Sequence, residues 1–243
     1  MFETLIYEKT DAVAVITLNR PEVMNIHNTA MRDDLYEALS AIRADDEIRV
    51  VLFKGAGDKA FCAGADLTEF LTAPPPTAAR AVRFDTDLWD LFASMPQTLI
   101  CAVHGYCLGS GIEITLCCDL VMASEDARFG LPEVGLGIIP AAGGTQTVPR
   151  AVGRALALEM MLTNRWLEAP EALRAGLVNR VVPRDRLWTE ADASARLIAA
   201  RHPQTVQFVK EAVLRGLDLT LDQGLALEKG LALRLSIDNR QQK

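Results

Sequence analysis

Two glutamates lie in sequence surroundings that are unusual for charged side chains. Glu113 follows two glycines in the apolar stretch LGSGIEITL, residues 108–116. Glu133 lies in ARFGLPEVGLGIIPAAGGTQ, a stretch rich in glycine that holds few other charges. Two carboxyl groups in apolar surroundings have raised and mutually split pKa values, so that one can release a proton while the other accepts one. Such a pair can hold a water molecule and exchange protons with it.

Each glutamate also has a purely structural explanation. Ser110 and Glu113 match the S-x-x-E capping box, in which the glutamate accepts a hydrogen bond from the serine backbone N–H. That arrangement contributes about 1 kcal/mol to helix stability. Glu133 reads equally well as a solvated loop residue. The local sequence therefore leaves catalysis and structure open as explanations.

Two glycine-containing turns could supply the complementary positive site. They lie in FCAGADL, residues 61–67, and in GYCLGSGIEI, residues 105–114. Backbone N–H groups at the start of a helix are unpaired and attract developing negative charge. If the N–H groups of Ala65 and Ser110 converged, they would form an oxyanion hole. Ordinary strand-to-helix turns contain the same glycines, so neither turn establishes a function alone.

The elements that must position these groups follow from the apolar pattern. Residues 12–19, 49–57 and 98–105 are apolar runs typical of strands, and the last two, which end in glycine, are expected to be buried on both faces of a sheet. Residues 29–44 repeat apolar side chains at helical spacing, and Asn28 or Thr29 can cap the start. Strand, helix and strand in this order predict a parallel α/β sheet with right-handed crossovers.

The remaining segments complete this layout. Three prolines in LTAPPPTA, residues 71–78, forbid regular structure and predict a surface loop. Apolar spacing predicts a helix over part of 76–96. From about residue 144 the pattern is helical, except for VNRVVP at 178–183. An α/β core followed by a helical C-terminal section is therefore expected.

Composition excludes several classes of function. The net charge of −7 and the pI near 5.1 argue against binding to nucleic acid or to an anionic membrane. The N-terminus lacks the pattern of a signal peptide, and no apolar stretch is long enough to span a membrane, so we expect a cytoplasmic protein. Five cysteines without paired spacing predict free thiols, and three scattered histidines predict no metal site.

Several ordered motifs resemble one known family. HGYCLGSGIEITLCCDLVMASEDARFGLPEVGLGIIPAAGGTQTVPRAVG is similar to the signature of the enoyl-CoA hydratase/isomerase (crotonase) family, and NRPEVMNIHN, FCAGADL and ALRAGLVNRVV extend the likeness over nearly the whole chain. The resemblance implies an α/β fold, a spiral of ββα units with a helical C-terminal trimerisation region. It places the core with the acyl-CoA site at residues 1–185 and the oligomerisation region at 186–243. A homotrimer, or a dimer of trimers, is implied.

The resemblance also implies a reaction and a site. The backbone N–H groups of Ala65 and Ser110 would hold the thioester carbonyl of a 2-enoyl-CoA, and water would add to give a 3-hydroxyacyl-CoA. Glu113 would help deprotonate the attacking water, and Glu133 would supply the proton that reaches C2. No cofactor is implied, because coenzyme A is part of the substrate. The residues implied to contact substrate are Val23, Met24, Ala63, Asp66 and Leu67.

The sequence departs from the family pattern at three positions. Ser110 stands where relatives have a third glycine, so the hole depends on whether its φ is allowed to a serine. Glu22 and Thr68 stand where relatives often have lysines near the phosphates of coenzyme A. Asp66 is also explained as a simple helix N-cap. Double-bond isomerisation of a 3-enoyl-CoA and non-catalytic acyl-CoA binding are therefore kept as alternatives.

Overall fold

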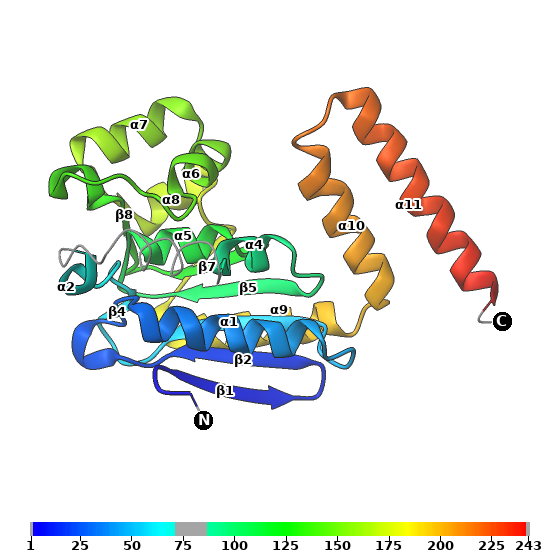
Figure 1. The fold of residues 1–243 in the computed structure, drawn as a ribbon, viewed down its shortest axis with the longest axis horizontal. Coiled ribbons are helices and arrows are strands. Elements are labelled where there is room, and N and C mark those ends of the chain that lie inside the picture. Colours follow the sequence, from blue (N-terminus) through cyan, green and yellow to red (C-terminus); the bar gives the residue numbers. More distant parts are fainter. Residues whose placement is uncertain (1, 71–86, 242–243) are drawn as a thin grey trace.

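The computed structural model describes residues 2–70 and 87–241 (Figure 1). The loop expected at 71–78 lies outside the described residues. The helix expected after it is seen as α4, Leu88–Ala93. Asp87 caps α4, because its carboxylate accepts hydrogen bonds from the backbone N–H groups of Trp89 and Asp90.

A six-stranded sheet forms the centre of the molecule, in the order β1-β2-β3-β5-β7-β10. Only the β1–β2 pair is antiparallel, and the other neighbours run parallel. The strands are β1 Leu5–Thr10, β2 Val13–Leu18, β3 Val50–Gly55, β5 Thr98–Val103, β7 Leu120–Ser124 and β10 Arg180–Val182. The strands predicted at 12–19, 49–57 and 98–105 are confirmed as β2, β3 and β5.

A second sheet of short strands lies beside the first, in the order β4-β6-β8-β9. Its strands are β4 Ala60–Cys62, β6 Tyr106–Leu108, β8 Arg128–Gly130 and β9 Leu167–Glu168. The chain enters the large sheet with β3, β5 and β7 and then the small sheet with β4, β6 and β8, and helices follow. This repetition is the spiral of ββα units that the resemblance implied, so the expected fold class is confirmed.

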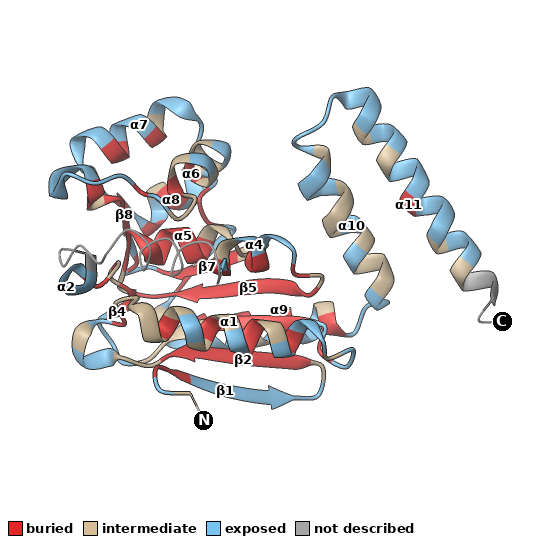
Figure 2. Ribbon diagram, in the orientation of Figure 1, coloured by how far each residue is buried: buried red, intermediate tan, exposed pale blue. Residues whose placement is uncertain are grey.

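Strands β2, β3 and β5 are buried on both faces of the large sheet, which explains why they are continuously apolar, whereas the edge strand β1 is largely exposed (Figure 2). Along β3, Val51 and Phe53 pack on the side of α1, Thr29–Arg43, while Val50 and Leu52 pack on the side of α9, Leu187–Ala199. The α1 side holds the larger core and also receives α4 and α5, Ser110–Leu116. Asn28 caps α1 by accepting a hydrogen bond from the Met31 N–H at 2.9 Å, as expected.

The other elements connect these layers. The remaining helices of the core are α2 Leu67–Phe70, α6 Gly144–Val152, α7 Arg154–Thr163 and α8 Ala169–Ala175. Short 3-10 helices occur at η1 Pro21–Val23, η2 Pro132–Leu136 and η3 Arg184–Arg186. Glu113 therefore lies on α5 and Glu133 on η2.

Two C-terminal helices stand away from the core and pack on each other (Figure 1). They are α10, Pro203–Gly216, and α11, Leu221–Gln241. The Lys210 ammonium of α10 ties the pair to the core, since it lies 2.8 Å from both the Asp119 carboxylate and the Gln97 carbonyl oxygen. Helix α9 packs on the sheet, so the part that stands apart begins at Pro203.

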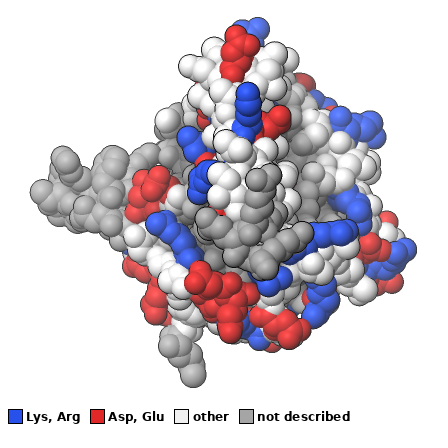
Figure 3. All heavy atoms as spheres, turned by 90° about the vertical axis from the view of Figure 1, so that its right-hand side faces the viewer, with Lys and Arg blue, Asp and Glu red and all other residues white. Residues whose placement is uncertain are grey.

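The surface charges and the cysteines are as the composition predicts. Figure 3 shows the side of the molecule that carries α10 and α11, with acidic and basic side chains intermingled and no extended basic surface. Within the described ranges, no helix is both long and apolar enough to cross a membrane. All five cysteines are free thiols, as expected, and Cys62, Cys101 and Cys107 are buried.

Candidate active site

The two glycine turns meet at one edge of the small sheet. Strands β4 and β6 are parallel neighbours, so the turns that follow them leave at the same edge. A methyl group built onto Gly109 would lie only 3.5 Å from the Cα atom of Gly64. Ala65 and Ser110 each come directly after one of these glycines. The structure therefore brings the two residues together, as the oxyanion-hole hypothesis requires.

The backbone N–H of Ala65 is not used by the fold. Ala65 forms a parallel β-bridge with His27, in which the His27 N–H donates to the Gly64 carbonyl and the Asp66 N–H donates to the His27 carbonyl, each at 2.8 Å. In a parallel bridge the residue between these two bonds directs its own N–H to the opposite side. No described residue accepts a hydrogen bond from the Ala65 N–H.

The backbone N–H of Ser110 lies at the start of α5 and has no acceptor among residues 2–70 and 87–241. Gly109 precedes it with φ 50° and ψ −117°, a conformation that L side chains rarely adopt. Ser110 itself is not among the residues with positive φ. The serine is therefore compatible with this turn, because the unusual conformation falls on Gly109.

Glu113 is 3% exposed and is held by a distant part of the chain. Its Oε1 accepts hydrogen bonds from the backbone N–H groups of Ala142 at 2.9 Å and Gly144 at 3.0 Å. Gly144 is the first residue of α6, so this carboxylate sits at the positive end of that helix. A methyl group on Gly144 would lie 2.9 Å from Oε1. Glycine is therefore needed for this contact.

The capping-box explanation of Glu113 is wrong. The N-cap of α5 is Gly109, and Ser110 is the first helical residue. Glu113 is consequently one position too far along the helix for a capping box. Its backbone N–H bonds to the Gly109 carbonyl at 3.1 Å, while one carboxylate oxygen reaches across to Ala142 and Gly144.

Glu133 is 9% exposed, and its carboxyl group lies over Gly109. A methyl group on Gly109 would lie 2.6 Å from Oε1 of Glu133. Its Oε2 is buried and has no hydrogen-bond partner in the described part of the chain. Burial, and to a smaller extent the Glu113 carboxylate, raises the pKa of Glu133 to about 7 against an opposing hydrogen bond from its own backbone. The interpretation of Glu133 as a solvated loop residue is wrong.

The two carboxyl groups thus differ in their surroundings. Glu113 is an acceptor fixed by two N–H donors, whereas Glu133 changes protonation near neutral pH and has an oxygen free to bind. Both lie beside the turn that carries Ser110. This arrangement can hold a water molecule, take a proton from it and return a proton nearby.

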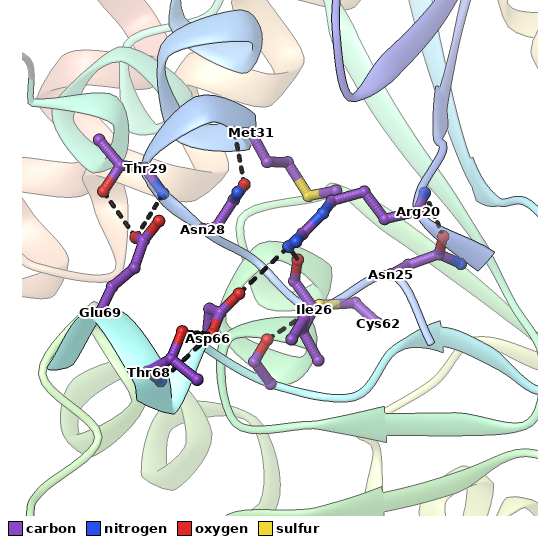
Figure 4. Close-up of polar contacts among 11 residues, drawn as sticks. Arg20, Asn25, Ile26, Asn28, Thr29, Met31, Cys62, Asp66, Thr68 and Glu69 are labelled. Carbon is purple, nitrogen blue, oxygen red and sulfur yellow. Dashed lines mark hydrogen bonds and ion pairs between the residues drawn. The ribbon is translucent and has the colours of Figure 1, made fainter. Parts of the chain in front are cut away.

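A loop formed by residues 20–28 packs against the Ala65 turn (Figure 4). The Ala63 N–H donates to the Met24 carbonyl at 3.1 Å, and Val23 ends η1 just before it. Asp66 precedes α2 and accepts hydrogen bonds from Thr68, through the backbone N–H at 3.2 Å and the hydroxyl at 2.6 Å. This agrees with the N-cap explanation of Asp66. The side chain of Leu67 is partly exposed, at 37%.

Three groups that shape the site were not found from the sequence. The N–H donors of Ala142 and Gly144 lie in a glycine-rich stretch, which signals a turn but not its partner. Asn25 is fully buried with φ 55°, and its side-chain amide donates to the Ala56 and Ala60 carbonyls, each at 2.9 Å. Arg20 links this loop to Asp66. The motif NRPEVMN marked the loop but not these contacts.

Two other residues are separated from the site by chemistry or position. Burial raises the pKa of the Cys62 thiol to about 11, so it is neutral at physiological pH. His104 is buried, and its Nε2 has no partner among the described residues. It lines a cavity of about 220 Å³ with Lys54 and Trp188, near the start of α9. No cluster of three or more metal-ligating side chains occurs within residues 2–70 and 87–241.

Comparison with known proteins agrees with this geometry. The sequence model for enoyl-CoA hydratase/isomerase matches residues 8–242. The (E)-benzylidenesuccinyl-CoA hydratase of Thauera aromatica is 40% identical, over 90% of this chain and 85% of its own. The short-chain-enoyl-CoA hydratase of Clostridium acetobutylicum is 38% identical, over 92% and 86%.

Solved structures give the same result. A crystal structure of an enoyl-CoA hydratase subunit from Geobacillus kaustophilus superimposes with a TM-score of 0.92 at 35% identity, covering 99% of this chain and 93% of that one. The match extends over both sheets and the C-terminal helices. The chain therefore belongs to the enoyl-CoA hydratase/isomerase family and has the crotonase fold.

Proposed function

We propose that the protein adds water across the 2,3 double bond of a 2-enoyl-CoA to give a 3-hydroxyacyl-CoA. The observation that carries this proposal is the pair of buried carboxyl groups beside the Ser110 turn, one fixed as an acceptor and one with a pKa of about 7. Relatives named as hydratases support it.

The reaction balances with protein groups alone. The water oxygen bonds to C3 while Glu113 takes one of its protons, and the electron pair of the double bond moves toward the thioester carbonyl. The N–H groups of Ala65 and Ser110 stabilise the resulting enolate oxygen, a contribution of about 3–4 kcal/mol for each donor in comparable sites. Protonated Glu133 then delivers a proton to C2. No further cofactor is needed by this scheme.

The decisive test is the loss of the conjugated enoyl-thioester absorbance when the protein is mixed with crotonyl-CoA. Glu113→Gln and Glu133→Gln should each lower kcat by at least about 10²-fold, because each removes a proton-transfer group. Glu168→Gln is the matched control, since Glu168 is an exposed glutamate on β9. If both site variants retain hydration within a few-fold of the parent, the proposal is wrong.

Isomerisation of a 3-enoyl-CoA is a second candidate. The raised pKa of Glu133 favours it, because a single carboxyl group that titrates near pH 7 can remove a proton from one carbon and return it to another. Incubation with a 3-enoyl-CoA distinguishes the two reactions. An isomerase converts the 3-enoyl-CoA to the 2-enoyl product and tolerates Glu113→Gln. A hydratase without isomerase activity leaves the 3-enoyl-CoA unchanged and forms the 3-hydroxy product only from a 2-enoyl-CoA. Binding of saturated acyl-CoA without turnover of any unsaturated thioester would instead indicate a non-catalytic binder.

We also propose that α10 and α11 take part in a homotrimer or a dimer of trimers. Both helices expose large apolar side chains, including Val209, Val213, Leu214, Leu221 and Leu225. Apolar side chains grouped in this way favour protein contacts over solvent. Light scattering coupled to gel filtration tests the proposal: a monomer mass would contradict it.

A further inference from the structure

The Ala65 turn is held by side chains on the 20–28 loop and on α2, and Figure 4 shows how they converge. The Arg20 guanidinium Nη1 donates to the Ile26 carbonyl at 2.8 Å and lies 3.5 Å from Oδ2 of Asp66. Glu69 makes a second tie, since its Oε2 accepts from the N–H and the hydroxyl of Thr29. The Arg20 contacts reach Ile26 and Asp66, which lie next to the two residues of the His27–Ala65 bridge.

The two residues that Arg20 contacts lie on opposite sides of the His27–Ala65 bridge. Ile26 directly precedes His27, and Asp66 directly follows Ala65. One guanidinium therefore contacts both segments of the bridge. The bridge itself fixes the peptide planes on either side of Ala65. Holding Ile26 and Asp66 together therefore fixes the direction of the Ala65 N–H.

The contact is built to be stable. The side chains of Arg20 and Asp66 are only 20% and 12% exposed, so solvent screens their attraction less than at an open surface. Hydrogen bonding from Thr68, together with the nearby Arg20, lowers the pKa of Asp66 and keeps it ionised. The backbone N–H of Arg20 donates to the Asn25 side chain at 2.9 Å, and Asn25 in turn is anchored to the Ala56 and Ala60 carbonyls. The backbone of Arg20 is therefore held in place by these hydrogen bonds.

We propose that Arg20 is a positioning residue for catalysis, and that its contacts with Ile26 and Asp66 aim the Ala65 N–H at the substrate carbonyl oxygen. This inference rests on the proposed hydration of 2-enoyl-CoA. Because donors in an oxyanion hole act only when they are well aligned, a displacement of about 1 Å can lower the rate on the order of 10²-fold. Loss of Arg20 should therefore reduce the stabilisation of the transition state more than it reduces the affinity for substrate.

The test compares Arg20→Met, Arg20→Lys and the control Arg196→Met. Lysine keeps the charge for Asp66 but has no planar group to reach the Ile26 carbonyl at the same time. Arg196 pairs with Asp192 on the outer helix α9 and is remote from the site. For hydration of crotonyl-CoA we expect Arg20→Met to lower kcat about 10- to 100-fold with KM within about 3-fold. Arg20→Lys should recover part of this loss, and Arg196→Met should match the parent.

A second readout reports the hydrogen bond directly. Butyryl-CoA carrying ¹³C at the thioester carbonyl is saturated and cannot turn over, and infrared difference spectroscopy gives its carbonyl stretch when bound. Donation from the hole lowers this frequency, so the parent and Arg196→Met should show a shift that Arg20→Met largely loses. Far-UV circular dichroism confirms that each variant is folded, and if Arg20→Met does not fold, Arg20→Lys carries the comparison with the same signs.

The outcomes separate this inference from the function it rests on. A parent protein that binds butyryl-CoA without a carbonyl shift would refute the oxyanion hole, and the role of Arg20 with it. A normal shift in the parent that persists in folded Arg20 variants would refute the positioning role alone. A rise in KM with kcat unchanged would also overturn it, because Arg20 would then contact the coenzyme A portion of the substrate.

Discussion

The two turns that present the N–H groups of Ala65 and Ser110 are stabilised by different means. The Ser110 turn is fixed by main-chain geometry, since the first turn of α5 follows a glycine in a conformation closed to other residues. The Ala65 turn leads into α2 and is held by side chains, from Arg20, Asn25 and Glu69. The proposed hydration uses both donors at once, so a substitution that disturbs either turn should lower its rate.

This difference indicates which substitutions should disturb each turn. The Ser110 turn is crowded, with Glu133 and Gly64 both in reach of Gly109, so it should fail through added volume at one position. The Ala65 turn is less crowded around Gly64, where an added methyl group would meet no atom of the described residues closer than the Leu108 carbonyl oxygen at 3.6 Å. Its geometry should be disturbed in smaller steps, by the loss of single side-chain contacts or by backbone strain.

Gly109→Ala should have the largest effect on catalysis. The new methyl group would overlap Oε1 of Glu133, and an alanine at φ 50° and ψ −117° is strained by on the order of 1–3 kcal/mol. We expect kcat for crotonyl-CoA to fall by about 10²- to 10³-fold, as when an oxyanion donor is removed. Steady-state kinetics on folded protein checks this. Activity within about 5-fold of the parent would show that the Ser110 turn tolerates volume and would remove the contrast.

Glu133→Gln should stabilise the protein while it lowers kcat by about 10²-fold. The folded-state pKa of Glu133 is raised from 4.5 to about 7, so the native protein loses stability as the pH rises between these values, because the unfolded chain releases the proton first. Glutamine removes this loss. The free energy of unfolding should therefore rise by up to on the order of 3 kcal/mol at pH 8 and hardly change at pH 4.

Urea unfolding of parent and variant at pH 4, 6 and 8 measures this prediction. Glu168→Gln controls for a general effect of removing a carboxylate, and its effect should depend little on pH, because Glu168 is exposed. A Glu133→Gln variant that is less stable than the parent at pH 8 would mean that the buried carboxylate is not costly. The proposed role of Glu133 as a neutral-pH acid would then lose its physical basis.

The fold was largely predictable because its signals are local and repeated. Apolar runs identified β2, β3 and β5, and helical spacing with a capping asparagine identified α1. The short strands β4, β6 and β8 have three residues each, too few for a periodic pattern to emerge. They became visible only as partners in a sheet, although they carry the turns that make the site.

The sequence singled out the residues of the candidate site but not the surroundings that the structure gives them. The partners of Glu113 lie 29 and 31 residues further along the chain, and such separations leave no local trace. The capping-box hypothesis failed because α5 begins after Gly109, whose backbone conformation a sequence pattern does not reveal. Likewise, Glu133 looks solvated in sequence, and its burial arises from tertiary packing around η2.

Gly64→Ala should give an intermediate effect and so distinguish strain from crowding. Gly64 has φ 116°, a value unfavourable for alanine, but among the described residues the nearest atom to an added methyl group is the Leu108 carbonyl oxygen at 3.6 Å. We expect a stability loss of about 1–2 kcal/mol and a fall in kcat of about 10-fold, with the residual activity retained because no atom blocks the substrate. Thermal unfolding and steady-state kinetics measure both. A loss equal to that of Gly109→Ala would show that the two turns are equally intolerant.

Glu69→Ala should have the smallest effect on catalysis, because its side-chain hydrogen bonds to Thr29 join α2 to α1 and not to Ala65 itself. The substitution removes two exposed hydrogen bonds to Thr29 at the start of α1, which should cost about 1 kcal/mol of stability and change kcat less than about 3-fold. Asp87→Ala is the matched control, since Asp87 makes the same kind of contacts at the start of α4. If Glu69→Ala lowers kcat well beyond Asp87→Ala at equal loss of stability, the Ala65 turn is held by its whole set of ties. The Ala65 turn would then differ from the Ser110 turn in the number of its side-chain contacts, and not in the contacts of Arg20 alone.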